Sequence, residues 1–275
     1  MSSFKYAISS ADEAPKSAPI LLTGSICENL KKAAALGYNA IEVHTREDAA
    51  IDYAGIASAM KDTNTAISMV VTGRLFTQGR CNLIDDAPYV TTAAMEGMKR
   101  YIEIAARLNA GIIVGWAKGN IPAGGTRETY LDRLGGNLNI LCELGKKSGV
   151  TVNLEVINRY EVNLFTTMAE TRDFIRSYGL SNCYIHMDSF HMFIDEKDPF
   201  AALKDCGDLL GYLHVADYSR QYPGSGYMDF TRILKILDEI NYKGYVSVEC
   251  LPIPTKEEAA AKAIAHLKGC AASIG

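Results

Sequence analysis

The sequence lacks the cysteine and hydrophobic patterns that mark secreted, zinc-binding or membrane proteins. Its seven cysteines form no Cys-x-x-Cys pair and their number is odd, which favours reduced thiols over a disulfide framework or a zinc cluster. Uncharged apolar runs such as Gly111–Ala117 are much shorter than the roughly 20 residues that span a bilayer. No basic-then-apolar leader opens the chain. We therefore expect a cytoplasmic protein with no membrane partner.

The sequence also lacks an excess of charge of one sign and the familiar ligand-binding motifs. Its 28 basic and 32 acidic residues are finely interspersed, so no basic stripe is available for the phosphate contacts that dominate nucleic-acid affinity. The dinucleotide, Walker A, serine-hydrolase and zinc-protease patterns are all missing. These absences favour a small-molecule site and argue against a nucleic-acid partner.

What the sequence does contain is a regular alternation of β-rich runs and amphipathic helical patterns. The expected strands are Lys5–Ile8, Ala40–His44, Ala66–Val71, Gly111–Gly115, Thr151–Glu155, Cys183–Asp188, Leu210–His214 and Tyr245–Glu249. The expected helices are Cys27–Leu36, Tyr53–Asp62, Pro88–Leu108, Arg127–Ser148, Thr166–Tyr178, Pro199–Cys206, Phe230–Ile240 and Lys256–Lys268. Each pair occupies about 30 to 35 residues, the size of one βα unit.

Eight such units follow one another without a linker or a change of composition. They predict an α/β protein made of one catalytic domain over 1–275, a single (β/α)8 TIM barrel. A doubly wound open sheet is the structural alternative.

Ionisable residues end the last four expected strands. These residues are Glu155, Asp188, His214 and Glu249. The carboxyl ends of the strands form the active-site face of a TIM barrel, so the four side chains should converge there. Converging carboxylates repel one another unless a cation neutralises them. Oxygen donors with a single imidazole favour one divalent metal ion per chain, with Mn²⁺ first and Co²⁺ or Mg²⁺ as alternatives.

Glu155 and Glu249 are also the predicted catalytic residues. A metal flanked by two glutamates suits the removal and return of a proton beside a carbonyl group. One carboxylate removes the carbon-bound proton and the other delivers a proton to the opposite face, which inverts that carbon through a cis-enediolate. Asp188 and His214 would hold the metal without moving protons.

Further polar residues lie just beyond these strand ends. Glu161, His191 and Arg220 are placed to ring a polar substrate. The run PGSG at 223–226 is interpreted as a plain turn, although its amides would also suit a phosphate. His186 shares the pleat parity of Asp188, so we expect it inside the barrel as a hydrogen-bonded structural residue. His44 is assigned no role.

Four stretches carry a resemblance to a known family. They are LEVINRYE at 154–161, HMDSFHM at 186–192, HVADYSRQYPGSG at 214–226 and VSVECLP at 246–252. They resemble the ketose 3-epimerases of the xylose-isomerase-like TIM barrels, typified by the enzymes for D-tagatose and D-psicose. The resemblance implies the same metal ligands as the strand ends do, and it implies that Glu161, His191 and Arg220 grip the substrate. It also implies a homodimer or homotetramer.

The first half of the chain resembles a different branch of that family. The segments TGRLFTQGR at 72–80 and GWAKGNIP at 115–122 look closer to the branch that contains 5-keto-L-gluconate epimerase. In such an enzyme Arg74, Arg80 or Lys118 would meet a substrate carboxylate. Arg74, Lys118 and Trp116 are therefore the candidate specificity residues.

The leading hypothesis is a metal-dependent isomerase that epimerises carbon 3 of a keto-sugar, such as tagatose, fructose or psicose, or of a keto-sugar acid, such as 5-keto-L-gluconate or D-tagaturonate. An aldose–ketose isomerase and an enzyme for a phosphorylated ketose are the alternatives from the same class. A DNA-repair endonuclease, which the five histidines and the acidic balance argue against, and a non-catalytic sugar-binding barrel come from other classes.

Overall fold

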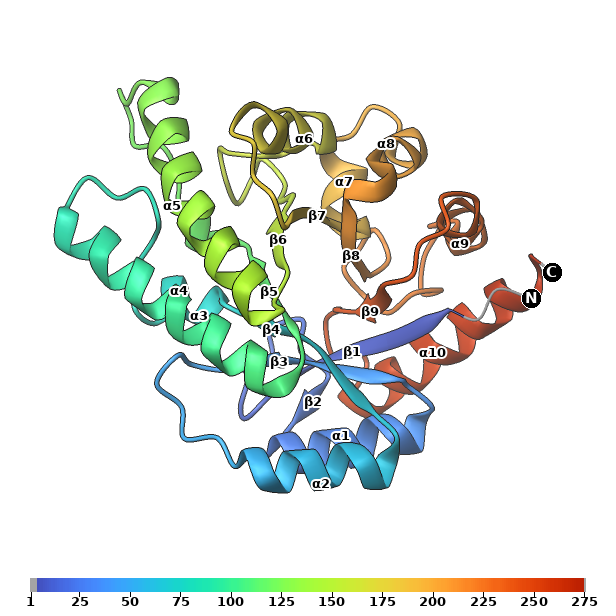
Figure 1. The fold of residues 1–275 in the computed structure, drawn as a ribbon. Coiled ribbons are helices and arrows are strands. Elements are labelled where there is room, and N and C mark those ends of the chain that lie inside the picture. Colours follow the sequence, from blue (N-terminus) through green and yellow to red (C-terminus); the bar gives the residue numbers. More distant parts are fainter. Residues whose placement is uncertain (1–3, 275) are drawn as a thin grey trace.

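The computed structural model describes residues 4–274 and contains a closed barrel of parallel strands surrounded by helices (Figure 1). The barrel strands are β1 (Lys5–Ala11), β3 (Ala40–His44), β4 (Ala66–Val71), β5 (Gly111–Val114), β6 (Val152–Glu155), β7 (Cys183–Asp188), β8 (Leu210–Val215) and β9 (Tyr245–Val248). Each strand pairs with the next in this order, and β9 pairs with β1 to close the ring. The predicted (β/α)8 barrel is therefore confirmed.

The outer ring of helices follows the predicted pattern closely. Its members are α1 (Ile26–Leu36), α2 (Tyr53–Thr63), α4 (Pro88–Leu108), α5 (Arg127–Ser148), α6 (Met168–Ser177), α8 (Pro199–Cys206), α9 (Phe230–Glu239) and α10 (Lys256–Ala272). Side-chain caps fix several of their starts, because an oxygen there satisfies a free backbone N–H. Ser25 and Glu28 form a capping box on α1, Asp229 caps α9, and Thr255 accepts from the N–H of Glu258 on α10.

Several short elements were not predicted. They are β2 (Leu22–Thr23), α3 (Gly73–Thr77), α7 (Ser189–Asp195) and two single 3-10 turns, η1 (Trp116–Lys118) and η2 (Gly207–Leu209). The segments α3, η1 and α7 directly follow β4, β5 and β7, so they lie on the loop side where the strands end. A helix of three to seven residues carries too little periodicity to be read from sequence.

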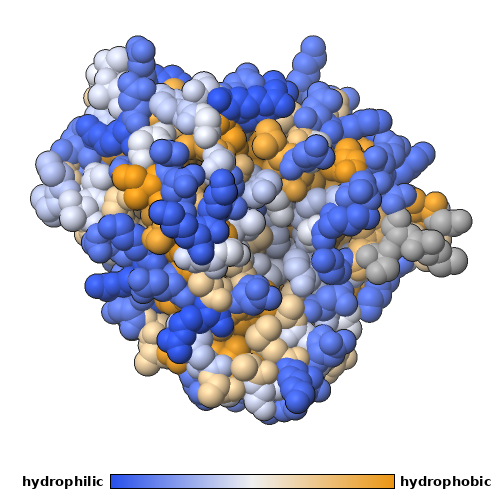
Figure 2. Space-filling view, viewed as in Figure 1, coloured by the Kyte–Doolittle hydropathy of each residue, from blue (hydrophilic) through white to orange (hydrophobic). Residues whose placement is uncertain are grey.

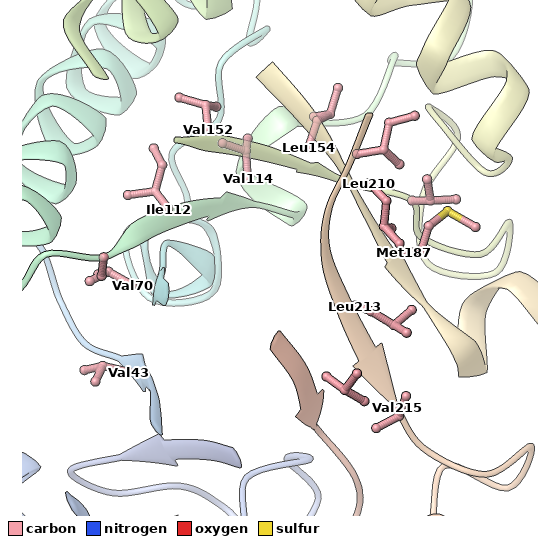
Figure 3. Packing of buried hydrophobic residues seen from close by; sticks show 14 of the residues in the cluster. Val43, Val70, Ile112, Val114, Val152, Leu154, Met187, Leu210, Leu213 and Val215 are labelled. Atoms are coloured by element: carbon pink, nitrogen blue, oxygen red, sulfur yellow. The ribbon is translucent and has the colours of Figure 1, made fainter. Parts of the chain in front are cut away.

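The apolar core lies mainly between the strands and the helices. Every second strand residue faces outward into this layer, as Val43, Val70, Ile112, Leu154 and Val215 do in Figure 3. A separate small cluster of Met69, Val71, Ile113 and Tyr212 fills part of the barrel interior. The inward positions of β6 to β9 beyond this cluster are largely polar and include Asn153, His186, Asp188, His214 and Ser247, all of them buried.

Two expectations from the sequence concern membrane-spanning helices and the state of the cysteines. Within residues 4–274 no helix is long and apolar enough to cross a membrane. All seven cysteines are free thiols and four of them are buried, which agrees with the expectation of reduced thiols.

Candidate active site

Four inward-facing side chains meet where β6 to β9 end. Glu155 and Asp188 are the last residues of β6 and β7, His214 is the penultimate residue of β8, and Glu249 directly follows β9. The register pairs Asp188 with His214 and His214 with Ser247, two residues before Glu249. Because paired residues in parallel strands share a face, the four predicted ligands point to one side of the sheet, into the barrel.

The distances place these groups within reach of a common ion. His214 Nδ1 lies 3.6 Å from Glu249 Oε2 and 3.9 Å from Asp188 Oδ2. One ligand atom each from Asp188, His214 and Glu249 fit within 4.8 Å of one another. A second group, within the same 4.8 Å limit, contains Glu155, Asp188 and His191. Asp188 thus links Glu155 to the other two predicted ligands, His214 and Glu249.

Among the residues that the structure describes, two buried atoms in this cluster have no hydrogen-bond partner. Asp188 Oδ1 accepts from the backbone N–H of Phe190 at 2.7 Å, whereas Asp188 Oδ2 is unpaired. His214 Nδ1 is unpaired as well. Buried polar atoms are nearly always satisfied, so two unpaired atoms this close to each other fit a site that could hold a cation. The acidic and histidine side chains could therefore hold a metal ion.

A glutamate that the sequence did not single out orients His214. Glu42, on β3, is fully buried, and its Oε2 lies 2.6 Å from His214 Nε2. The same oxygen accepts from Ser247 Oγ at 3.2 Å, and Oε1 lies 2.9 Å from His44 Nε2. With its Nε2 proton held by Glu42, the imidazole presents its Nδ1 lone pair to the cluster.

Burial and mutual repulsion shift the protonation of this cluster strongly. Burial, with the nearby carboxylates of Glu249 and Asp188, raises the pKa of Glu155 to about 8. Burial also raises the pKa of Asp188 to about 6. Burial alone would lower the pKa of His214, but the carboxylates of Glu42, Glu249 and Asp188 raise it to about 10. Without a cation the site therefore retains protons at neutral pH, which a metal would displace.

The three predicted substrate-gripping residues line one wall of the same cavity. Arg220 Nη2 lies 3.4 Å from Glu249 Oε2 and Nη1 lies 3.5 Å from Glu161 Oε1. The amide nitrogen of Asn158 donates to His191 Nδ1 at 2.7 Å, which leaves the proton of a neutral His191 on Nε2. Burial and the Arg220 cation lower the pKa of His191 well below its usual range, so the ring is neutral.

The loop that carries Arg220 is organised around a buried aspartate. Arg220 has a φ of 59°, in the left-handed region. The carboxylate of Asp217 accepts backbone N–H groups of Tyr218, Gly224, Gly226 and Met228. Two amides of the PGSG run thus donate to a carboxylate within the loop, as a structural turn requires.

The candidate specificity residues occupy different places. Trp116 and Arg74 line the cavity, but the Arg74 guanidinium is bound to Asp12 Oδ1 at 2.6 Å and to the carbonyl of Glu13 at 2.8 Å. Lys118 is fully buried beside the cavity, and its Nζ donates to the carbonyls of Gly115 and Glu155. Of the three candidates, Trp116 and Arg74 thus face the cavity, whereas Lys118 is not among its lining residues.

Two histidines depart from their sequence interpretation. His44 lines the cavity, and its Nε2 lies 3.8 Å from Glu249 Oε1, although no role was expected for it from the sequence. His186 faces the barrel interior as predicted, with its ring centroid 4.1 Å from that of His214. Within residues 4–274 neither of its nitrogens has a hydrogen-bond partner, which differs from the expected hydrogen-bonded state.

These side chains open into a cavity of about 690 Å³. One part of it is lined by Glu155, Glu249 and the three predicted substrate-binding residues. Residues 13–20 and α3 line another part. On the face shown in Figure 2, hydrophilic side chains surround a paler recess, and hydrophobic residues lie near its lower edge.

A comparison with known sequences decides the family. The sequence profile of the xylose isomerase-like TIM barrel matches residues 30–270. The chain belongs to this family. An L-ribulose 3-epimerase from Mesorhizobium japonicum is 31% identical over 219 residues, which cover 78% of this chain and 71% of the relative.

Two further proteins that are similar to this chain come from Escherichia coli. A 3-dehydro-D-guloside 4-epimerase is 39% identical over 113 residues, 41% of this chain and 43% of the relative. The crystal structure of a 3-keto-D-glucoside 4-epimerase superposes on this chain with a TM-score of 0.82 at 24% sequence identity. The superposition covers 97% of this chain and all of that one, and it shows that the two folds are alike. The predicted family and the predicted class, an isomerase of the epimerase type, are confirmed.

Proposed function

We propose that this protein is a metal-dependent epimerase that inverts carbon 3 of a keto-sugar or a keto-sugar acid. The observation that carries the proposal is the placement of two glutamates, Glu155 and Glu249, around the buried pair of Asp188 and His214. The similarity to an L-ribulose 3-epimerase over most of the chain supports the same chemistry.

Asp188 and His214, with both glutamates, would hold one divalent ion. The unpaired Asp188 Oδ2 and His214 Nδ1 support this assignment, and hard oxygen donors with one imidazole favour Mn²⁺, then Co²⁺ or Mg²⁺. When bound, the cation supplies electrostatic stabilisation to the negative charge that develops on the substrate oxygens as a proton leaves carbon 3.

The two glutamates carry the proton transfers. One carboxylate accepts the proton from carbon 3 on one face, and the carboxyl group of the other returns a proton on the opposite face. Both carboxyl groups line the cavity, and Arg220 Nη2 lies 3.4 Å from Glu249 Oε2. In the reverse direction the two roles exchange.

Glu161, His191 and Arg220 orient the substrate. His191 donates from Nε2, Arg220 donates from its two terminal nitrogens, and Glu161 accepts hydroxyl protons. All three lie on the wall formed by the loops after β6, β7 and β8. A positioned acid–base pair contributes about 10²–10⁴-fold, so the remaining rate enhancement must come from this orientation and from the ion.

A second candidate is epimerisation at carbon 4 of a keto-glycoside. The 39% identity to a 3-dehydro-D-guloside 4-epimerase favours it, and the chemistry is the same because the reacting carbon again lies beside a carbonyl. A phosphorylated ketose is not favoured, because the PGSG amides that suited a phosphate donate to Asp217.

Product analysis tests the proposal. The protein is stripped of metal, reloaded with Mn²⁺ and incubated with D-fructose, D-tagatose and D-tagaturonate, and the products are separated by chromatography. The carbon-3 epimer of at least one substrate is expected, and it should be absent without metal. Formation of an aldose instead would identify a sugar isomerase.

We also propose that the protein is cytoplasmic and forms a homodimer or a homotetramer.

A further inference from the structure

His44 lies beside Glu249 on the side away from Arg220. Glu249 Oε2 is 3.4 Å from Arg220 Nη2, whereas Glu249 Oε1 is 3.8 Å from His44 Nε2. The two oxygens of this carboxylate therefore face two different side chains. In the closed barrel β8, β9, β1 and β3 follow one another, so Glu249 after β9 stands between Arg220, which follows β8, and His44, which ends β3. A substrate carbon held at Glu249 thus has Arg220 on one side and His44 on the other.

The contact with Glu42 determines which nitrogen of His44 carries a proton. Glu42 Oε1 lies 2.9 Å from His44 Nε2. An ionised carboxylate only accepts hydrogen bonds, so in the neutral ring Nε2 carries the proton and Nδ1 keeps a lone pair. Within residues 4–274 Nδ1 forms no hydrogen bond, and it does not belong to the buried atoms without a partner. His44 therefore offers an accessible acceptor.

His44 and His191 line the same cavity and offer opposite hydrogen-bonding groups. In the closed order of the strands β3 stands across the barrel from β7, which precedes His191, so the two imidazoles come from opposite walls. His191 accepts from Asn158 at Nδ1 and presents an Nε2–H donor, which suits a carbonyl or hydroxyl oxygen. His44 presents an acceptor, which suits only a group with a proton to donate. In a sugar that group is a hydroxyl.

We infer that His44 is a further substrate-binding residue, whose Nδ1 accepts the proton of a substrate hydroxyl on the side of the reacting carbon away from Arg220. The inference rests on the proposed epimerase and adds to it a requirement for a hydroxyl at this place. Glu42 then orients two imidazoles with one carboxylate, that of His214 toward the cluster and that of His44 toward the substrate. A sugar without this hydroxyl leaves the acceptor unpaired and binds more weakly.

Two replacements separate the substrate contact from the contact with Glu42. The side-chain oxygen of Asn can occupy the position of Nδ1, and the side-chain nitrogen of Gln can occupy the position of Nε2. His44→Asn therefore keeps the acceptor for the substrate and loses the donor to Glu42, whereas His44→Gln keeps the donor and loses the acceptor. A role of His44 that acts only through Glu42 would give the opposite order of effects on substrate binding.

Calorimetry on the Mn²⁺-saturated full chain measures the affinity for D-tagatose or D-fructose, whichever binds more tightly. We expect this affinity to fall about fivefold or more in His44→Gln and to stay within about twofold in His44→Asn. His266→Phe is a control, because His266 lies on α10 and is not among the residues that line the cavity; its sugar affinity should not change. An unchanged sugar affinity in His44→Gln, or a loss in His44→Asn alone, would overturn the inference.

The Mn²⁺ affinity of the same variants provides a second readout with the reverse pattern. It should fall in His44→Asn, which no longer donates to Glu42, and stay unchanged in His44→Gln. A sugar affinity that follows the Mn²⁺ affinity from variant to variant would show that His44 acts only through Glu42, and the substrate contact would then be refuted.

Deoxy sugars test the hydroxyl itself on the wild-type protein, without any change to the fold. The 1-, 4-, 5- and 6-deoxy forms of the chosen ketose are titrated into the wild type and into His44→Gln. One of them should bind the wild type about fivefold or more weakly than the parent sugar does. That loss should disappear in His44→Gln, because the partner of the hydroxyl is already missing there. Equal losses in both proteins for every deoxy form would contradict the contact.

Deuterium exchange at carbon 3 is followed separately in the same preparations. Exchange in the wild type, combined with equal sugar affinities of the wild type and His44→Gln, would support the epimerase and overturn the contact. Sugar binding that depends on His44 and on one hydroxyl, without any exchange, would support the contact and count against epimerisation at carbon 3. Failure of both ketoses to bind the wild type would overturn the contact.

Discussion

Glu42 Oε2 lies 2.6 Å from His214 Nε2, deep in the barrel and behind the atoms that face the cavity. This contact fixes which imidazole nitrogen carries the proton and turns Nδ1 toward Asp188 and Glu249. The orientation of the one predicted nitrogen ligand thus depends on a residue from β3, on a different part of the ring from the other ligands.

Replacing Glu42 should weaken metal binding. In Glu42→Gln the side chain keeps its size but loses its charge, so the imidazole is less basic and less firmly oriented. We expect the Mn²⁺ affinity to fall by about 10–100-fold, the usual cost of losing such a partner. Calorimetric titration of the metal-free protein measures this. Glu103→Gln, at an exposed site on α4, should leave the affinity unchanged. Equal Mn²⁺ affinities of Glu42→Gln and the wild type would contradict the account.

Metal binding should release protons and weaken as the pH falls. In the metal-free protein the pKa of Glu155 is about 8 and that of His214 is about 10, so both hold protons at pH 7 that a metal must displace. Lowering the pH favours the protonated, metal-free form, so the apparent Mn²⁺ affinity should fall as the pH falls. We expect release of about two protons per ion near pH 7. Calorimetry in buffers of different ionisation enthalpy counts them, and a count of zero would refute the assignment.

Asp217 should act on substrate binding through Arg220. Asn at this position can accept hydrogen bonds at only one of its two side-chain atoms, so part of the backbone network of the loop is lost. Asp217→Asn is expected to raise KM about tenfold or more, with a smaller change in kcat, as Arg220→Ala should also do. Asp229→Asn is a suitable control, because Asn caps a helix as well as Asp does. A fall in kcat alone would contradict this role.

Lys118 should stabilise the fold without selecting the substrate. Its buried Nζ donates to the carbonyls of Gly115 and Glu155. Lys118→Met removes both hydrogen bonds and should lower the free energy of unfolding by about 1–3 kcal/mol, measured by thermal or denaturant unfolding. The ratio of kcat/KM between D-tagaturonate and D-tagatose should not change. A shift of that ratio toward the uncharged sugar would restore Lys118 as a specificity residue.

The fold and the convergence of the four candidate ligands could be predicted because each depends on local patterns. A parallel barrel places strand ends on one face, so Glu155 and Asp188, as the terminal residues of their strands, are recognisable from sequence. The same reasoning misses Glu42, which lies inside a strand. An acid between Ile41 and Val43 in a strand otherwise typical of a buried sheet was the available signal.

The contacts of the candidate specificity residues were harder to predict. Arg74 was chosen for its charge, but its pairing with Asp12 joins residues far apart in the sequence and depends on how the loops fold over the barrel. Lys118 lies in a turn of three residues, where no periodicity indicates whether a side chain faces the cavity or the protein interior. Long-range loop contacts of this kind are absent from local patterns.

The most direct test of the account is the position of hydrogen exchange on the substrate. Mn²⁺-loaded wild-type protein and Glu249→Gln are incubated in heavy water with the keto-sugar that turns over fastest, and deuterium is located by NMR. The account predicts deuterium at carbon 3 with inversion, and a rate reduced by about 10²–10⁴-fold in Glu249→Gln. Exchange at carbon 1, or wild-type exchange in Glu249→Gln, would contradict it.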